Sequence, residues 1–388
     1  MSACRECASR GLLLSGLAGH IDRAVDRRVG DRARDLLGLR DEELARAACP
    51  GAPAEALRAS RSQARHVALE RNLEAAGCWS TCPHRPGFPA SLSALGPAAP
   101  RALFGAGDRA LLSAAEPERA ATVVGARRAS AYGREVAHDL ARTLAASGIA
   151  VISGLALGVD SAAHEGALEG AGSTIAVLGA GADRPYPRSH RRLYERIRRA
   201  GLVISEQPPG SPTFRWMFPA RNRVMAALAG LTIVVEAAER SGSLITAEMA
   251  IEGGRQVGAV PGPVTSWRSA GANKLLADGA AVIRDAQDVL DLLLGPGAVS
   301  VERGGAAIDA LERAVLGAVE AGCTTADGVC DAENLAYTQA LGALGRLERK
   351  GYLGTDATGT LIRRALTAPA DGAGEGAGAL PLRSSGGR

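Results

Sequence analysis

The strongest constraint on the fold is an alternation of apolar and amphipathic segments between residues 118 and 292. Seven short runs rich in Val, Ile and Ala recur there: ATVVGA, IAVISG, STIAVLGA, LVISE, LTIVVEA, RQVGAVPG and AAVIRD. Most are separated by segments with helical periodicity, such as SAYGREVAHDLARTLAASG. Strands that are apolar throughout are typical of a parallel sheet whose two faces are both covered by helices. The pattern predicts an α/β domain with a doubly wound, mostly parallel sheet.

The segment before this domain divides into two parts. Residues 1–76 carry apolar positions at helical spacing and predict a small helical domain, of the SAM or helix-hairpin-helix type. Residues 77–117 are punctuated by Pro and Gly and predict a connector. A short strand is expected in this connector, near Ala102 to Gly105.

The segment after the α/β domain begins with a Gly-rich linker at 293–306. Residues 307–366 then have the pattern of three helices and a hairpin, which is the order of a winged helix. Its third helix is expected at about Leu335 to Lys350, with the wing around Gly351 to Arg363. The composition of the tail, 367–388, is typical of disorder.

Composition and charge exclude some classes of protein. No apolar run approaches the roughly 20 residues of a membrane span, and the N-terminus has no signal-peptide pattern, so we expect a cytoplasmic protein without a membrane partner. The formal net charge is +4, and residues 120–285 hold 19 basic against 14 acidic residues. This mild excess permits a polyanionic partner without demanding one.

Seven cysteines do not suggest a full disulfide framework. Cys4 and Cys7 form a CxxC, and Cys78 and Cys82 form a CxxxC with His84 nearby. A structural zinc ion uses such ligands. Four reduced thiols are the alternative. The sequence has one CxxC and no second CxxC to complete a zinc-binding set, which favours reduced thiols. We therefore predict no metal ligand and no cofactor, and leave zinc binding by these cysteines open.

Ligands of a doubly wound sheet bind beyond the carboxyl ends of its strands. After ATVV, Gly125 allows a tight turn, Arg127 or Arg128 projects from it, and Ser130 is placed to cap the next helix. After AVI, Gly154 and Gly158 would allow backbone N–H groups to approach an anion.

Two more strands end in the same way. Glu236 follows the strand TIVV, and the small residues Ser241, Gly242 and Ser243 precede a helix expected to begin near Leu244. The next strand is followed by Pro261, Gly262, Gly271 and Asn273. Each loop alone is as consistent with an ordinary strand–helix turn, but four at one edge of a sheet favour a phosphate-binding crevice.

Known catalytic and nucleotide-binding motifs are absent. The sequence has no GxxxxGK[ST], no GxSxG and no HExxH, and in GAGADR Arg184 replaces the last glycine of a dinucleotide-binding loop. His164 is a candidate base, although a lone helical His is more often structural. Asp160 lies four residues before it, so the two are expected to pair on one helix face, while Asp160 or Ser161 is expected to cap that helix.

Aromatic residues are scarce in this chain, yet three occur within five positions of FRWMFPARNRVMAAL. Phe214, Trp216 and Phe218 alternate, which places them on one face of an extended segment. A helix is expected to begin at PARNR, with Arg221 and Arg223 in its first turns. Because a helix N-terminus disfavours cations, a bound phosphate would explain those arginines.

Together these segments resemble the DNA-processing protein A (DprA/Smf) family. The matching motifs, spanning about 120–282 in the family's order, are VGARRASAYG, ISGLALGVDSAAH, TIAVLGAGADRPYP, ISEQPPG, FPARNRVMAAL, VVEAAERSGSLITA, GRQVGAVPG and GANKLLADGA. The departures are few: Ala180 and Ala182 replace a Cys and a Leu in a sheet-packing region.

The resemblance implies an extended Rossmann-like domain that binds single-stranded DNA, protects incoming strands in natural transformation and loads the RecA recombinase. It also implies a homodimer without catalytic residues, with single-strand-binding protein as a further candidate partner. It gives Arg127 and Arg215 roles at DNA phosphates and Phe218 a role at a base.

Loops and resemblance together define the predicted DNA- and phosphate-binding set: Gly125, Arg127, Ser130, Tyr132, Gly133, Ser153, Gly154, Gly158, Asp160, His164, Arg215, Phe218, Arg221, Asn222, Arg223, Glu236, Ser241, Gly242, Ser243, Thr246 and Asn273.

Two alternatives stay open. The first is a phosphoribohydrolase-like enzyme acting on nucleoside monophosphates, although the loop ERSGSLITAEMA lacks the PGGxGTxxE signature. The second makes the winged helix a reader of duplex DNA, with the centre a dimerisation core. The third helix of that module offers Arg346, Arg349 and Lys350 only at its end, which favours a protein-contact or packing module instead.

Overall fold

The computed structural model describes residues 2–25, 31–170, 172–297, 308–350, 352–355 and 360–363. The chain forms two compact units, 1–301 and 302–388. The predicted linker at 293–306 lies mostly outside the described residues, and the predicted disordered tail at 367–388 lies entirely outside them.

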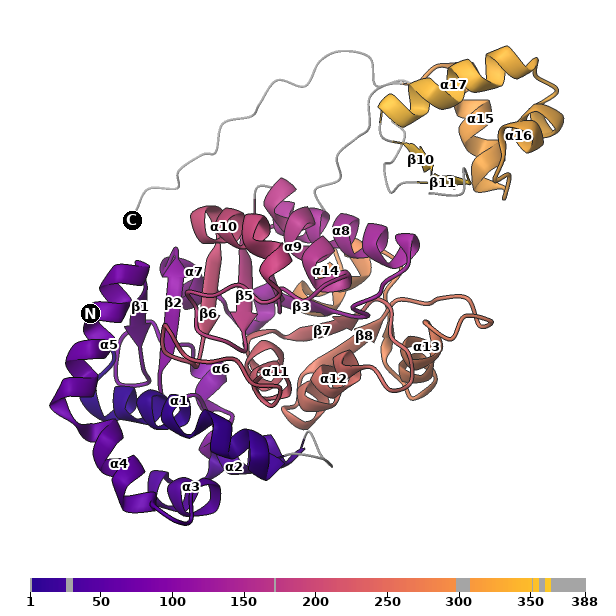
Figure 1. Ribbon diagram of the computed structural model, residues 1–388. Coiled ribbons are helices and arrows are strands. Elements are labelled where there is room, and N and C mark those ends of the chain that lie inside the picture. The colour runs from indigo at the N-terminus through magenta and orange to yellow at the C-terminus, as the bar shows by residue number, and fades with distance from the viewer. Residues whose placement is uncertain are drawn as a thin grey trace, which may run out of the picture. The chain divides into compact units, whose positions relative to one another are not determined.

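The first unit is built on a sheet of nine strands (Figure 1). In spatial order these are β1 (Trp79–Thr81), β2 (Leu103–Gly107), β6 (Leu202–Ser205), β5 (Thr174–Leu178), β4 (Ala150–Ser153), β3 (Ala120–Val124), β7 (Leu231–Val234), β8 (Gln256–Ala259) and β9 (Ala281–Val282). Every neighbouring pair from β6 to β9 is parallel, whereas β1 and β2 join the edge antiparallel. The predicted doubly wound, mostly parallel sheet is confirmed.

The segment 77–117 does more than connect two domains. The strand predicted near Ala102 to Gly105 is β2, and its register pairs Phe104 with Ser205 of β6. The strand β1, which the sequence pattern did not predict, pairs with β2. The predicted connector therefore supplies one edge of the sheet, together with the short helices α6 (Ala90–Ser93), η1 (Gly96–Ala98), α7 (Ala110–Ala114) and η2 (Pro117–Arg119).

Helices cover both faces of the parallel strands. Val123, Val151 and Ile233 pack in one core with α8 (Ala131–Ala146), α9 (Val159–Glu169) and α14 (Ala286–Leu294). The next residues along the same strands, Val124, Ile152 and Val234, pack in the opposite core with α11 (Met217–Leu228), α12 (Gly242–Glu252) and α13 (Ala270–Ala277). Successive side chains of a strand point to opposite faces, so strands apolar at every position require both layers.

The N-terminal helices are part of the same compact unit as the sheet. They are α1 (Arg5–Val25), α2 (Asp31–Gly38), α3 (Asp41–Ala48), α4 (Pro53–Arg61) and α5 (Gln63–Ala76). Leu12 of α1 and Leu73 of α5 share a core with Phe104 of β2. That core also includes α10 (Arg191–Ala200), which follows the 3-10 turn η3 (Arg188–His190). The predicted helical domain thus packs against the sheet edge instead of folding apart from it.

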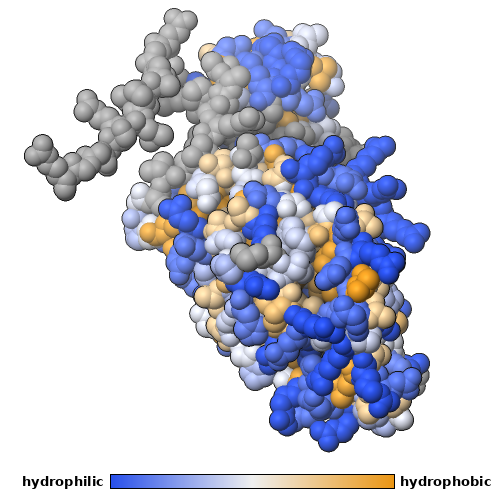
Figure 2. All heavy atoms as spheres, turned by 90° about the vertical axis from the view of Figure 1, so that its left-hand side faces the viewer, coloured by the Kyte–Doolittle hydropathy of each residue, from blue (hydrophilic) through white to orange (hydrophobic). Residues whose placement is uncertain are grey.

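The face that carries these N-terminal helices is mostly hydrophilic, with hydrophobic residues in small groups (Figure 2). In the described part of the chain, no helix combines the length and the apolar composition that crossing a bilayer requires.

The second unit has the predicted order of a winged helix. Its elements are α15 (Ala310–Glu320), α16 (Ala326–Glu333), α17 (Tyr337–Arg349), β10 (Leu353–Thr355) and β11 (Leu361–Arg363). The two strands pair antiparallel, and Tyr352 and Leu353 enter a core with Val315 and Leu347. Part of the expected wing, 356–359, lies outside the described residues.

Candidate nucleic-acid interface

A groove opens where the strand order of the sheet reverses. The strands β4, β5 and β6 extend to one side of β3, whereas β7, β8 and β9 extend to the other. The chain segments that follow the carboxyl ends of β3 and β7 therefore run in different directions. The space between them is the usual ligand site of a doubly wound sheet. The groove has a volume of about 490 Å³ and is lined by Val124, Gly125, Ala126, Arg127, Arg128, Ala156, Asp160, Phe218, Pro219, Arg221, Asn222, Met225, Ala238, Ser241, Gly242, Ser243, Ile245, Thr246, Trp267 and Arg268.

The loop after β3 is held by Glu236. The Glu236 carboxylate accepts a hydrogen bond from the backbone N–H of Ser130 at 2.8 Å. Ser130 caps α8, as predicted, by accepting from the N–H of Gly133 at 3.0 Å. A side chain at Gly133 would clash with the Glu236 carboxylate, which explains the glycine there. These residues shape the turn that presents Arg127.

Gly158 provides the close approach between the loops after β3 and β4. Its φ is +82°, and a Cβ there would collide with the carbonyl oxygen of Ala126. It is the N-cap of α9, and no side chain caps this helix. The expectation that Asp160 or Ser161 does so is therefore wrong. Asp160 instead accepts the N–H groups of Gly154 and Ala156, at 3.1 and 3.3 Å.

Arg221 forms the floor of the groove. Its side chain is only 8% exposed, and one Nη atom donates to the carbonyl oxygens of Gly154, at 2.8 Å, and Val177. Its other Nη atom lies 3.9 Å from the Asp160 carboxylate. Burial lowers the pKa of Arg221 to about 10, so it stays charged near neutral pH. The guanidinium occupies the space that a side chain at Gly154 would need.

The exposed walls of the groove alternate arginines with aromatic rings. The Arg127 Cζ lies 5.8 Å from the centroid of the half-buried Phe218 ring, which in turn contacts Tyr186 at 4.9 Å between centroids. The Arg268 Cζ lies 4.9 Å from the ring of Trp267, which is 66% exposed. Guanidinium groups at these distances are attracted to ring faces.

The third side of the groove is the start of α12. The helix begins at Gly242 with Ser241 as its N-cap, two residues before the predicted start at Leu244. Ser243, Thr246 and Asn222 complete this side. The N–H groups of the first helical turn add partial positive charge there. Asp160 is the one carboxylate among the described residues that line the groove, against four arginines.

Eleven members of the predicted set lie outside the lining of the groove, with Ser130 among them. The Tyr132 hydroxyl donates to the carbonyl of Pro261 at 3.1 Å, and Asn273 makes two hydrogen bonds with the backbone of Gly262. These contacts brace the loop after β8. Arg215 is exposed beside Trp216, just before α11. Gly133 and Glu236 support the loop after β3, and Gly154 and Gly158 shape the loop after β4.

Ser153 and His164 are buried, and their hydrogen bonds go to the sheet. The Ser153 hydroxyl donates to the carbonyl of Val123 at 2.7 Å, and His164 Nδ1 bonds the Thr174 hydroxyl at 2.7 Å. The expected pairing of His164 with Asp160 is wrong, because Asp160 is turned toward the loop after β4. Burial lowers the pKa of His164 to about 3, so it is neutral. Neither side chain lines the groove.

Arg223 is also an interior residue. Its Nη2 bonds both carboxylate oxygens of Glu206, at 2.8 and 2.7 Å, and its other nitrogens donate to the carbonyls of Ala98 and Ala220. Arg223 pairs with a carboxylate and Arg221 with Asp160. A bound phosphate is therefore not needed to explain either arginine in α11, contrary to the expectation from the helix dipole.

The aromatic segment does not present one face. The helix α11 begins at Met217, before the predicted PARNR, so Phe218 belongs to a helix and not to an extended strand. Trp216 is 3% exposed, and its Nε1 donates to the Ala18 carbonyl of α1 at 3.0 Å. Phe214 packs in the same core with α1. These two rings anchor the segment to the N-terminal helices, and Phe218 alone of the three lines the groove.

Sequence reasoning missed Trp267, Arg268 and Tyr186. The signal for the first two was the WR pair in PGPVTSWRSAGANK, which follows the carboxyl end of β8 and thus reaches the same edge as the other loops. Tyr186 gave no comparable signal, because only the fold brings its ring to Phe218.

The basic residues at the end of α17, the third helix of the second unit, bond a carboxylate within that unit. Glu312 of α15 has no exposed side-chain surface, and its carboxylate accepts from Arg346 at 2.9 Å and from Lys350 at 2.5 Å. A buried carboxylate needs such partners. Two of the three cations considered for duplex readout therefore stabilise the core of this unit.

Fold and groove define a Rossmann-like α/β protein with a cationic, aromatic-lined groove at the switch point of its sheet. Residues 79–294 match the model of the family described as DNA recombination-mediator protein A, which covers more than half of the chain. The chain belongs to that family.

Relatives of this chain agree with the family assignment. A putative DNA processing protein DprA of Mycobacterium tuberculosis is 46% identical over 239 residues, covering 60% of this chain and 61% of the relative. The DNA processing protein DprA of Streptococcus pneumoniae is 44% identical over 168 residues, covering 43% of this chain and 59% of the relative. An X-ray structure of DprA from Streptococcus pneumoniae superposes with a TM-score of 0.59 at 32% identity, covering 75% of this chain and 98% of that one. The chain thus spans about three fifths of the length of these curated relatives.

Proposed function

We propose that this protein binds single-stranded DNA in the groove at the switch point, without catalysing a reaction on it. The observation that carries the proposal is the alternation of arginines and rings on the groove wall, Arg127 with Phe218 and Arg268 with Trp267. Arginines attract the phosphates of a single strand, and the ring faces offer stacking surfaces to unpaired bases. In a duplex the bases are already stacked, so this wall favours a single strand.

The arginines of the groove would act on DNA in two ways, according to whether they are exposed or buried. Arg127 and Arg128 are exposed and free to meet phosphates, whereas Arg221 is buried and would contribute a fixed positive potential from below. The N–H groups at the start of α12 are a further candidate phosphate contact. Arg215, which is exposed just before α11, would extend the cationic path beyond the groove.

The same site gives little support to a phosphoribohydrolase-like enzyme. Such an enzyme needs a carboxylate available to the reacting sugar. Asp160, the carboxylate among the described groove residues, already accepts two N–H groups and lies near Arg221. We expect no release of free base when the protein is incubated with nucleoside monophosphates.

The cellular role forms part of the proposal and rests on family resemblance. In it, the protein protects incoming strands during natural transformation and loads RecA onto them in the cytoplasm. It acts as a homodimer, with single-strand-binding protein as an additional partner.

A filter-binding titration of one oligonucleotide, as single strand and as duplex, over a range of salt concentrations tests the binding proposal. We expect tighter binding of the single strand and a linear fall of log K with log salt concentration. Equal affinity for both forms, or binding insensitive to salt, would contradict it.

A further inference from the structure

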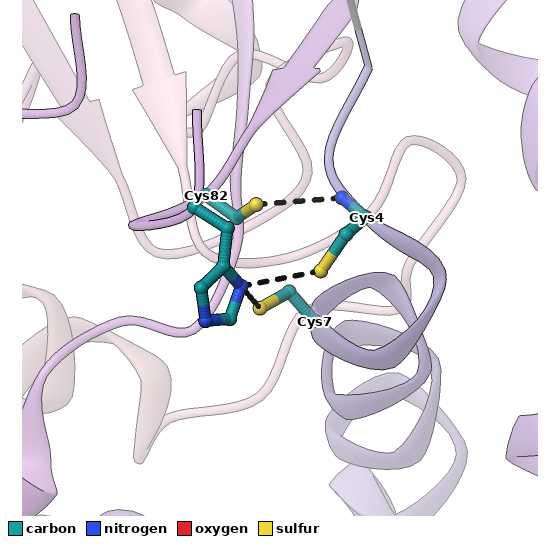
Figure 3. Close-up of side chains that lie close together, drawn as sticks. Cys4, Cys7 and Cys82 are labelled. Atoms are coloured by element: carbon teal, nitrogen blue, oxygen red, sulfur yellow. Dashed lines mark hydrogen bonds between the residues drawn. The ribbon is translucent and has the colours of Figure 1, made fainter. Parts of the chain in front are cut away.

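Three cysteines and a histidine from two distant segments meet beside the edge of the sheet (Figure 3). The Sγ atoms of Cys4, Cys7 and Cys82 and a ring nitrogen of His84 all lie within 4.8 Å of one another. His84 Nδ1 is 3.3 Å from the sulfur of Cys4 and 3.4 Å from that of Cys7. None of these residues lines the groove proposed to bind DNA.

The backbone brings the two pairs together. Cys4 immediately precedes α1 and Cys7 lies in its first turn, so a CxxC at a helix start turns both sulfurs to one side. Cys82 follows the last residue of β1, with His84 two positions later. The segments are joined by bonds from Ala3 N–H to the Ser80 hydroxyl, at 3.0 Å, and from Cys4 N–H to the Cys82 sulfur, at 3.3 Å.

We propose that these four residues bind a structural Zn²⁺ ion. Three thiolates and one imidazole form a donor set that zinc favours in closed, tetrahedral sites. With ordinary Zn–S and Zn–N bond lengths, a tetrahedral site separates sulfur from nitrogen by about 3.6 Å and two sulfurs by about 3.8 Å. The two sulfur–nitrogen distances here are within a few tenths of an ångström of that geometry.

Burial indicates a structural site. Cys7 and Cys82 are 4% and 0% exposed and belong to the core shared by α1, α5 and the sheet edge. A metal ion held there would join the start of α1 to the end of β1. The CxxxC spacing groups Cys78 with Cys82, but the Cys78 thiol donates to the Ala76 carbonyl and stays outside the cluster. The fourth position is taken by His84.

Metal analysis of the full-length protein tests the proposal. The protein is purified without chelator, dialysed, and assayed for zinc by elemental mass spectrometry. We expect about one zinc ion per chain for the wild type and well under about a tenth of an ion for Cys7→Ser. The matched control is Cys78→Ser, which removes a partly buried thiol of the same region and should keep the full complement.

Two further measurements do not depend on the folding of Cys7→Ser. Replacing zinc by Co²⁺ in the wild type should produce the intense visible absorption of tetrahedral cobalt together with thiolate-to-cobalt charge transfer. His84→Ala alters an exposed side chain and should weaken zinc binding at least about tenfold in a chelator competition, while His84→Cys restores it.

The possible results separate clearly. Metal-free wild type that takes up neither Zn²⁺ nor Co²⁺ overturns the proposal, as does a disulfide between two of these cysteines in protein kept under reducing conditions. Equal zinc content in the wild type, Cys7→Ser and His84→Ala would place any bound metal elsewhere. Loss of zinc from both variants and its retention by Cys78→Ser supports the site.

Discussion

The guanidinium carbon of Arg127 lies 5.8 Å from the centroid of the Phe218 ring. Arg127 comes from the loop after β3 and Phe218 from the first turn of α11, so the contact joins two walls of the groove. It places a cation that can bind a phosphate beside a ring that can stack on a base. The pair could therefore contact the phosphate and the base of one nucleotide.

Removing the Phe218 ring should weaken binding of single-stranded DNA. Stacking of one base contributes about 1–3 kcal/mol, so Phe218→Ala should raise Kd by about 5- to 150-fold, and Phe218→Trp should retain most of the affinity. Fluorescence anisotropy with a labelled oligonucleotide measures this. If Phe218→Leu binds as well as the wild type, the ring does not stack.

Removing the Arg127 charge should change the salt dependence as well as the affinity. A single-strand phosphate contact contributes about 0.7 to the slope of log K against log salt concentration, so Arg127→Ala should flatten the slope by about that amount. Arg101→Ala, which removes an exposed arginine outside the groove, is the control and should leave the slope unchanged. Identical slopes for both variants would remove Arg127 from the phosphate-binding set.

Trp267 should report DNA binding by its fluorescence. Of the three tryptophans, Trp267 is 66% exposed at the groove, whereas Trp216 is 3% exposed in a core. Stacking on a base should quench Trp267 emission when an unlabelled single strand is added, and Trp267→Phe should abolish most of the change. A change that persists in Trp267→Phe would point to Trp79 or to a conformational rearrangement.

Arg223 should matter for stability and not for DNA contact. Removing one partner of a buried ion pair costs about 3–5 kcal/mol, so Arg223→Met should lower the free energy of unfolding in urea by roughly that amount. Arg127→Ala, at an exposed position, should change it by less than about 0.5 kcal/mol. A stable Arg223→Met protein with weakened DNA binding would return Arg223 to the interface.

His164 should make stability fall in mild acid. Burial lowers its pKa from 6.5 to about 3, so between these values the unfolded chain takes up a proton that the folded protein does not. The contribution of His164 to the free energy of unfolding is therefore fully present above about pH 6.5. It declines as the pH falls, by up to about 1.4 kcal/mol per pH unit. Urea unfolding of wild type and His164→Asn from pH 7 to 5 measures the difference. Because His66 has a pKa shifted in the same direction, the comparison with the variant is the decisive quantity.

The sequence by itself determined the layered sheet and the edge at which the site lies. Strands such as TIAVL are apolar at every position and so require helices on both faces, and their parallel direction collects the loops after β3, β4, β7 and β8 at one edge. The helix–helix–helix–hairpin order of the second unit was equally readable, because its apolar periodicity is local.

Only the tertiary structure decided which polar side chains reach the groove. Arg221 and Arg223 lie two positions apart on α11, yet one forms the groove floor and the other bonds Glu206 in the interior. The side chains that surround each arginine in the fold, and not their spacing in the sequence, decide which of the two reaches the groove. Cys82 and His84 likewise meet Cys4 and Cys7 across more than 70 residues of sequence because β1 joins the sheet edge beside α1. Such pairings depend on long-range packing, and no local pattern encodes them.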